Sequence, residues 1–172
     1  MSANFALNDY YQARVKAPFG TLGVRTEGDI VSEIVFLPKS IKPLTPQNKL
    51  AEKAATQIAR YLDDPEFKFK LPLKEVGTEF QRRVWHAISN IPSGHTLSYG
   101  AIARHIRTGP RAVGQACGAN WFPLVIPCHR VVASGGIGGF GSQTDAQNTD
   151  EGSYHMAIKR WLLAHEGIKT GA

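Results

Sequence analysis

The chain has 172 residues, with 20 lysines and arginines against 14 aspartates and glutamates, and a formal net charge of +6. Its 42% of hydrophobic and 20% of charged residues exclude wholesale disorder and suit one or two domains with real cores. No apolar run reaches the length of about 20 residues that spans a bilayer, and no secretion signal is recognisable, so we expect a cytoplasmic protein. Cys117 and Cys128 are too few for a disulfide framework or a four-cysteine zinc site.

The positive charge is concentrated in one stretch of the chain. Residues 80–144 contain neither an acidic residue nor a lysine. Their arginines are Arg82, Arg83, Arg104, Arg107, Arg111 and Arg130. Because a guanidinium group pairs with phosphate through two hydrogen bonds, this tract favours an anion-binding surface, with nucleic acid as the obvious large anion. The alternative is a solvated basic face that pairs with acids from elsewhere in the chain.

The first half of the chain predicts a small sheet with a covering helix. Short β-rich runs in Tyr10–Leu37 are separated by turn sequences at 18–20 and 27–29, which indicates three antiparallel strands. Apolar residues then recur at helical spacing until Asp63-Asp64-Pro65 ends the pattern. The alternating stretch FKFKLPLKEVG that follows predicts an extended segment leading into the second half.

A helix start marks the beginning of the second half. Thr78 with Gln81 three residues later forms a capping box, in which each side chain satisfies a free backbone donor. We therefore expect an α+β protein with a β-rich N-terminal domain over residues 1–75 and a helical C-terminal domain over 76–172.

Two further helices are predicted next to each other in the second half. Ser98 can cap a helix from Tyr99 to about Ile106, and Pro110 suits the first position of the next one. Two short helices joined by a tight turn are a candidate helix-turn-helix. Such pairs are also common in proteins that do not bind DNA.

The helix after Pro110 has few side chains that can read a base edge. Between Arg111 and Asn120, only these two residues and Gln115 carry long hydrogen-bonding groups, and the others are alanine, glycine, valine and cysteine. The small residues predict close approach to a groove wall, with binding that is independent of sequence. Tight packing within the protein is an equally good alternative.

Cys128 is the candidate nucleophile. It lies in Pro127-Cys128-His129-Arg130, between apolar flanks. Burial raises the pKa of a thiol and neighbouring cations lower it, so this cysteine could become a thiolate when needed. A buried structural cysteine is the alternative, and Cys117 in its small-residue helix fits that alternative well.

Glu166 is the candidate partner of His129. A last helix is predicted roughly over His155–Glu166, with Gly167 as its natural stop. An acid in the final turn opposes the helix dipole by about 0.3–1 kcal/mol, so Glu166 should have a cationic or hydrogen-donating partner. A carboxylate that orients an imidazole, which in turn activates a thiol, is the general logic of a catalytic triad. An exposed glutamate at a helix end is the alternative.

No metal or cofactor site is predicted. The spacing of cysteines and histidines matches no zinc motif. The glycine-rich run 135–141 lacks the Lys-Ser/Thr of a P-loop and is interpreted as a flexible wall of the site.

Several of these motifs resemble one known family. Pro127-Cys128-His129-Arg130-Val131, preceded by Asn120 and Pro123 and followed by 161–167 (WLLAHEG), is similar to the O6-alkylguanine-DNA alkyltransferases, also called methylated-DNA-protein-cysteine methyltransferases. The resemblance covers about 76–172. It implies DNA repair by direct reversal, in which Cys128 takes the alkyl group from O6 of guanine irreversibly, once per molecule, after the nucleotide has been flipped out of duplex DNA. It also implies a ribonuclease-H-like N-terminal domain, a helix-turn-helix in the C-terminal domain and no cofactor.

The resemblance further implies roles for single residues. His129 is the base, acting through a water molecule, Glu166 orients it, and Asn120 supports the turn around the site. Tyr99 borders the pocket for the flipped base, and Arg111 fills the vacated stack from the minor groove. The other expected substrate- or DNA-binding residues are Ala112, Gly114, Gln115, Arg130, Val131, Ser134 and Ser153.

The sequence differs from that family in the length of two connections. The turn between Ile106 and Arg111 is shorter than usual, and the loop from Gly135 to His155 is longer.

We expect double-stranded DNA as the partner, bound with little sequence preference, and no membrane. We expect a monomer in solution; cooperative binding along DNA is left open.

Two other classes of function stay open at this point. A thiol hydrolase using Cys128, a histidine and Asn120 would turn over many equivalents and would not need the arginine tract. A non-catalytic DNA-binding regulator would prefer one sequence, which the small-residue helix does not favour. Alkyltransferase-like proteins, which bind alkylated DNA without repairing it, lack the cysteine that this chain has at position 128.

Overall fold

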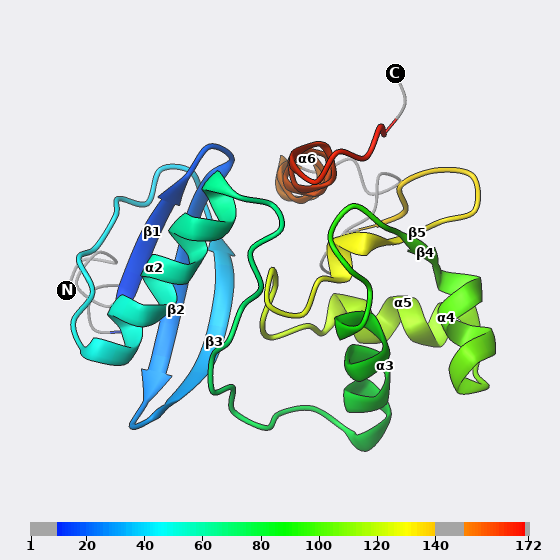
Figure 1. The fold of residues 1–172 in the computed structure, drawn as a ribbon, viewed down its shortest axis with the longest axis horizontal. Helices are drawn as coiled ribbons and strands as arrows, with labels where there is room; N and C mark the ends of the chain where they lie inside the picture. Colours follow the sequence, from blue (N-terminus) through cyan, green and yellow to red (C-terminus); the bar gives the residue numbers. More distant parts are fainter. Residues whose placement is uncertain (1–9, 140–149, 171–172) are drawn as a thin grey trace. The chain divides into compact units, whose positions relative to one another are not determined.

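The chain divides into two compact units. The computed structural model describes residues 10–139 and 150–170, without the side chains of 150–153 (Figure 1). Unit 1 is Met1–Glu75 and unit 2 is Val76–Ala172. Within the described residues, no helix has the length and apolar character needed to cross a membrane.

Unit 1 is built on a three-stranded antiparallel sheet. Its strands are β1 (Ala13–Ala17), β2 (Gly20–Glu27) and β3 (Ile30–Leu37), in the order β1-β2-β3. The turn between β2 and β3 contains Gly28 with φ +55°, a conformation that glycine adopts without a steric penalty. The predicted antiparallel meander is confirmed.

One helix covers the sheet of unit 1. Helix α2 (Lys49–Asp63) begins after Asn48, whose side chain accepts a hydrogen bond from the Ala51 amide at 2.8 Å. Figure 1 shows it lying across the three strands, and it contacts all of them. Its apolar face supplies the core together with the inner side of the sheet; fully buried members are Ala51, Ala54, Ile58, Leu22, Val24 and Val31. The predicted covering helix is confirmed.

The segment 64–74 returns from α2 along β3 in an extended conformation. Val31 donates to the carbonyl of Pro72 at 2.8 Å, and Lys74 donates to the carbonyl of Val31 at 2.8 Å. The side chain of Gln57 on α2 holds the same segment by accepting from the Lys70 amide at 2.9 Å and donating to the Lys70 carbonyl at 3.0 Å. The predicted extended segment is thus present and is fixed at both of its sides.

Unit 2 contains three packed helices in its first half. They are α3 (Glu79–Ser89), α4 (Tyr99–Ile106) and α5 (Pro110–Gly118), and each contacts the other two. The predicted capping box at the start of α3 is present, and Pro110 is in the first turn of α5 as predicted. Trp85 links α3 to α5 by donating from its indole nitrogen to the Ala116 carbonyl at 2.8 Å.

The last helix begins earlier than predicted. Helix α6 spans Asp150–His165, whereas the sequence predicted a loop up to His155. The end matches the prediction: Gly167 has φ +84°, and the Ile168 amide donates to the Leu163 carbonyl at 2.8 Å, closing the last turn.

Candidate active site

Cys128 lies at the start of a single turn of 3-10 helix, η1 (Cys128–Arg130). The chain continues into β5 (Val131–Val132), which pairs in parallel with β4 (Leu97–Ser98). Because α4 follows β4 directly, this pairing places Tyr99 beside the segment that carries Cys128. Cys128 itself is only 4% exposed.

Asn120 fixes the turn that leads into Cys128. Its side-chain nitrogen donates to the Ile126 carbonyl at 2.9 Å, and its side-chain oxygen accepts from the Phe122 amide at 2.9 Å. Both bonds join residues of the segment between α5 and η1 to each other. A hydrogen bond from Asn120 also lowers the pKa of Cys128, so this amide both shapes the turn and favours the thiolate.

His129 and Glu166 form the contact that the sequence predicted. His129 Nε2 is 2.8 Å from Glu166 Oε2, and both residues are buried, with 0% and 7% of their surface exposed. Glu166 is the residue just after α6, positioned by the turn that Gly167 closes. A carboxylate there fixes the ring of the histidine, because it accepts the proton on Nε2.

Burial keeps His129 neutral. The pKa of its ring is lowered mainly by desolvation, against the opposing influence of Glu166. Nδ1 of His129 is buried and has no hydrogen-bond partner within the described residues. With Nε2 donating to Glu166, the lone pair of Nδ1 is the one that can accept a proton.

The thiol of Cys128 is protonated at rest. Its pKa is raised well above the usual value, first by a hydrogen bond with Cys117 and then by burial. Asn120 and Lys159 lower the same pKa. Cys117, expected only to fill space in α5, therefore also contacts the candidate nucleophile.

Tyr99 lies against the glycine-rich run and near both cysteines. Its hydroxyl donates to the Gly139 carbonyl at 3.3 Å. Burial raises the pKa of this hydroxyl, and Cys117 and Cys128 raise it further, so it stays a proton donor. Gly138, with φ +74°, packs so closely that an added Cβ would be 2.8 Å from the ring, which explains a glycine at this place.

Lys159 is a residue of the site that the sequence interpretation missed. It is 0% exposed, and its ammonium group donates to the carbonyls of Val131 at 2.8 Å and Gly139 at 2.7 Å. The same group is 5.8 Å from the centre of the Tyr99 ring. Its position between Met156 and Leu162 on the buried face of α6 is a helical spacing that could have identified it.

Arg130 makes its observed hydrogen bonds inside the protein. We expected this residue to bind DNA, but its guanidinium donates to both carboxylate oxygens of Glu166, at 2.8 and 2.9 Å, and to the Ile91 carbonyl at 2.7 Å. Its side chain is only 12% exposed. Both carboxylate oxygens of Glu166 accept from this guanidinium, so Arg130 compensates the charge of Glu166 inside the protein.

The remaining candidates differ in exposure. Arg111 and Gln115 are exposed on α5, on the side opposite its buried residues, and Ala112 and Gly114 are half-buried. Ser134 is exposed and Val131 is buried, where its carbonyl accepts from Lys159. The side chain of Ser153 is outside the described residues.

Comparison with known proteins points to one family. A family model described as the DNA-binding domain of 6-O-methylguanine DNA methyltransferase matches residues 79–168. The methylated-DNA–protein-cysteine methyltransferase of Mycolicibacterium paratuberculosis is 35% identical over 142 residues, covering 78% of this chain and 86% of the relative. The protein of that name from Methanocaldococcus vulcanius is 32% identical over 167 residues, covering 95% of each chain.

Solved structures agree. The crystal structure of Mycobacterium tuberculosis O6-methylguanine methyltransferase has a TM-score of 0.72 at 30% identity and covers 91% of this chain and 92% of its own. The structure of Mycobacterium tuberculosis OGT in complex with DNA has a TM-score of 0.73 at 31% identity, covering 89% and 90%. This chain therefore belongs to the 6-O-methylguanine DNA methyltransferase family.

Proposed function

We propose that this protein repairs DNA by moving the alkyl group from O6 of guanine to the sulfur of Cys128, once per molecule. The carrying observation is the arrangement around His129: Nε2 is held at 2.8 Å by Glu166, while Nδ1 is buried without a partner in the described part of the chain. A neutral, oriented imidazole on the residue that follows a buried thiol in sequence can supply the base that this transfer needs. Membership of the family and the names of its relatives support the same reaction.

The proposed step balances as follows. Nδ1 of His129 accepts the thiol proton of Cys128 through a water molecule, and the positive ring is stabilised by Glu166. The thiolate attacks the alkyl carbon, a sulfur–carbon bond forms and the carbon–O6 bond breaks. The electron pair of that bond passes to the guanine, to which the Tyr99 hydroxyl is proposed to donate a proton. The charged imidazole then gives its proton to water, and Tyr99 takes one up from water. The thioether has no route back to a thiol, so the protein is consumed.

DNA binding is assigned to α4 and α5 as a helix-turn-helix. The exposed Arg111 and Gln115 and the half-buried Ala112 and Gly114 lie on one side of α5, which suits a minor groove with little sequence preference. The O6 atom lies inside the duplex, so the nucleotide has to be flipped out, with Arg111 filling the stack. Ser134 and Ser153 are proposed to border the pocket, and Val131 to support it through its carbonyl.

The resemblance to the family also supports proposals for the roles of the two units and for where the protein acts. Unit 2 is proposed to carry both DNA binding and chemistry, and the sheet and helix of unit 1 to have a ribonuclease-H-like arrangement. The protein is proposed to act as a monomer in the cytoplasm, without a cofactor.

The decisive experiment uses duplex DNA that carries radiolabelled O6-methylguanine. We expect one methyl group to move to each protein molecule, and peptide mapping to find it on Cys128. Cys128→Ser should receive none, whereas Cys117→Ser, the matched control, should still receive one. Label that stays on the DNA would reject the proposal, and more than one turnover per molecule would indicate the thiol hydrolase instead.

Glu166→Gln tests the role of His129 within this function. The change leaves the exposed face of α5 untouched, so DNA affinity should stay close to that of the wild type. The transfer rate should fall, because the amide stabilises a charged imidazole less than a carboxylate does. An unchanged rate would show that Glu166 only completes the end of α6.

A further inference from the structure

A basic groove lies in unit 1, whereas the residues proposed for the chemistry lie in unit 2. It has a volume of about 730 Å³ and runs between α2 and the segment 64–74. Its charged lining consists of Lys49, Lys53, Arg60, Lys68 and Lys70, with Glu52 as the single acid. Residues 1–75 hold 11 basic and 9 acidic groups, so nearly half of the basic ones but only one of the acids border this groove.

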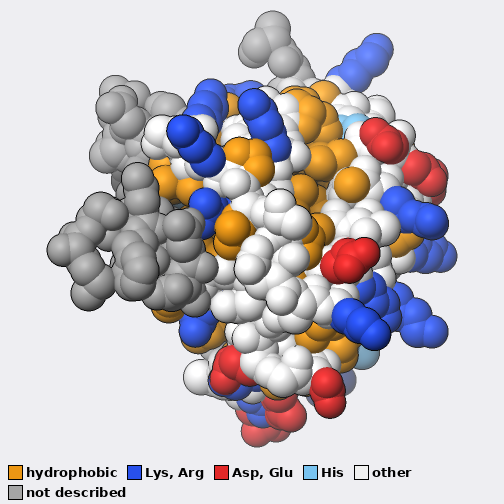
Figure 2. Space-filling model, turned by 90° about the vertical axis from the view of Figure 1, so that its left-hand side faces the viewer, with side chains coloured by type: hydrophobic (Ala, Val, Ile, Leu, Met, Phe, Trp, Pro, Cys, Tyr) orange, Lys and Arg blue, Asp and Glu red, His pale blue; other side chains and the backbone are white. Residues whose placement is uncertain are grey.

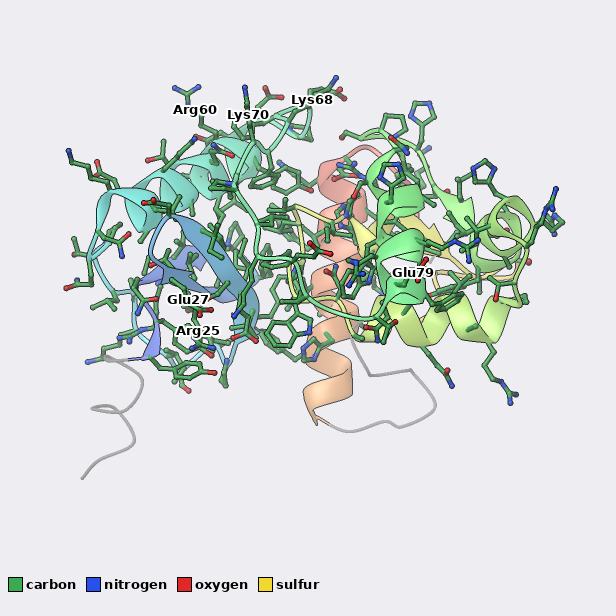
Figure 3. The ribbon with its side chains drawn as sticks, turned by 90° about the horizontal axis from the view of Figure 1, so that it is seen from below. Arg25, Glu27, Arg60, Lys68, Lys70 and Glu79 are labelled. Atoms are coloured by element: carbon green, nitrogen blue, oxygen red, sulfur yellow. The ribbon has the colours of Figure 1, made fainter. Side chains whose placement is uncertain are left out.

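The cations form two rows because of how each wall is built. Lys49, Lys53 and Arg60 are separated by four and seven residues, a spacing that puts them on one face of α2. On the other wall, Lys68 and Lys70 are exposed and alternate with Phe67 and Phe69, which are half-buried, as an extended backbone requires. Figure 3 shows Arg60, Lys68 and Lys70 extending from the same edge of unit 1.

The two walls are held at a fixed separation. The pair of hydrogen bonds between the Gln57 side chain and the Lys70 backbone joins them at 2.9 and 3.0 Å. Packing of Tyr61 from α2 against Phe69, with ring centres 5.6 Å apart, supports the same junction. The groove is therefore formed before any ligand arrives, which reduces the entropy lost on binding.

The five cations have no ion-pair partner among the described residues, and all five are exposed. Two basic residues elsewhere in unit 1 are paired: Arg25 lies 3.7 Å from Glu33 and Lys74 lies 3.0 Å from Glu27. Figure 2 shows basic and acidic side chains together on the face that it draws, so charges of both signs are available at the surface. Like charges around a hollow raise the local positive potential and favour an anion with several charges.

We propose that this groove binds the phosphodiester backbone of DNA as a second contact, separate from α4 and α5. Rows of lysines neutralise successive phosphates as point charges without reading bases. The half-buried Phe67 in the lining also offers an aromatic face on which a base of a single strand can stack. The choice of DNA among polyanions rests on the proposed function.

Protection of lysines from acetylation tests the location of the contact. The full-length protein is acetylated with and without an undamaged duplex, and in parallel with a single strand of the same sequence, and each lysine is quantified by mass spectrometry. Lys49, Lys53, Lys68 and Lys70 should be protected, whereas Lys16 and Lys42, which are exposed elsewhere on unit 1, should react equally in all samples. The arm with the stronger protection identifies the strand form. Equal reactivity of the groove lysines in every sample would overturn the proposal.

A charge-matched pair of variants tests the energetics. Lys53→Gln with Lys68→Gln removes two groove cations, and Lys16→Gln with Lys42→Gln removes the same charge elsewhere in unit 1. The slope of log affinity against log salt should become shallower by about 1.8 for duplex DNA in the groove variant, since each lost phosphate contact contributes about 0.9. The control variant should keep the wild-type slope. Equal slopes in all three proteins, or a loss of affinity for polyglutamate rather than for DNA, would overturn the proposal.

Failure of this proposal differs from failure of the proposed function. Methyl transfer to Cys128 at saturating DNA should be the same in the groove variant and the wild type. A wild type that binds DNA through the groove but transfers no methyl group would reject the repair function alone. A protein that transfers normally while its groove lysines stay unprotected would reject the groove alone.

Discussion

Charge is organised in opposite ways in the buried cluster of unit 2 and the basic groove of unit 1. In the buried cluster, formed by His129, Arg130, Lys159 and Glu166, each charged or titratable group has a protein partner within 2.9 Å. In the basic groove, the cations are exposed and no protein acid pairs with them in the described residues. Buried charges must be satisfied internally, which fixes their geometry, whereas exposed ones are free to take an external partner.

The difference has a direct energetic meaning. Removing one partner of a buried pair leaves an uncompensated charge, whereas removing an exposed cation changes stability little. Substitutions in the two regions should therefore separate stability from binding. The predictions below run from the largest expected effect on the free energy of unfolding to the smallest.

Arg130→Met should have the largest effect. The variant takes the guanidinium group away from the buried carboxylate of Glu166, and the free energy of unfolding should fall by about 3–5 kcal/mol. Urea denaturation followed by circular dichroism measures it. The double variant Arg130→Met with Glu166→Gln also removes the buried carboxylate charge and should recover much of the loss without recovering the transfer rate. A loss below about 1 kcal/mol in the single variant would mean that the pair behaves like an exposed one.

Lys159→Met should have an intermediate effect on stability and a clear one on chemistry. Two carbonyls, of Val131 and Gly139, lose their donor, which costs about 1–3 kcal/mol for an unsatisfied buried group. The pKa of Cys128 should rise, because Lys159 lowers it, so the rate-against-pH curve of methyl transfer should move to higher pH. Lys169→Met, at an exposed site, is the control and should change neither quantity. An unmoved pH curve would leave Lys159 with a structural role only.

Cys117→Ala should change the pH dependence of transfer more than stability. The hydrogen bond with Cys117 is the largest influence that raises the pKa of Cys128, so its removal lowers that pKa. A lower pKa gives more thiolate at a given pH, and the rising part of the rate-against-pH curve should move to lower pH. Cys117→Ser keeps a hydrogen-bond acceptor for the Cys128 thiol at this position and should move the curve less. A shift to higher pH would contradict the assigned contact.

Several features of the site were predictable because they depend on neighbours in sequence. The capping box at Thr78, Pro110 in the first turn of α5 and the stop at Gly167 are local signals, and the structure contains all three. The contact between His129 and Glu166 was predicted because an acid at a helix end needs a partner, which is again a local argument.

Other features depend on residues brought together from far apart. Arg130 belongs to an arginine tract without acids, and its sequence neighbourhood does not reveal that Glu166, 36 residues later, is its partner. The spacing of Lys159 with Met156 and Leu162 marks it as a residue of the buried helix face, but it does not reveal that the carbonyls of Val131 and Gly139 accept its hydrogen bonds. The groove needs α2 and the segment 64–74 side by side, a junction made by Gln57 across 13 residues of sequence. Pairing of this kind follows from packing, which no local pattern encodes.

The groove variant, Lys53→Gln with Lys68→Gln, should have the smallest effect on folding. Exposed residues without ion-pair partners contribute little, so the free energy of unfolding should stay within about 0.5 kcal/mol of the wild type. Any change should be an increase, because two like charges are removed from one hollow, and 1 M salt should abolish it by screening. Urea denaturation at low and high salt measures this. A loss well beyond that range would show that the two lysines hold the walls of the groove together, and their positive charge would then need no DNA to explain it. If the variant is as stable as the wild type but binds DNA less tightly, the two lysines act through contacts with the phosphates and not through folding.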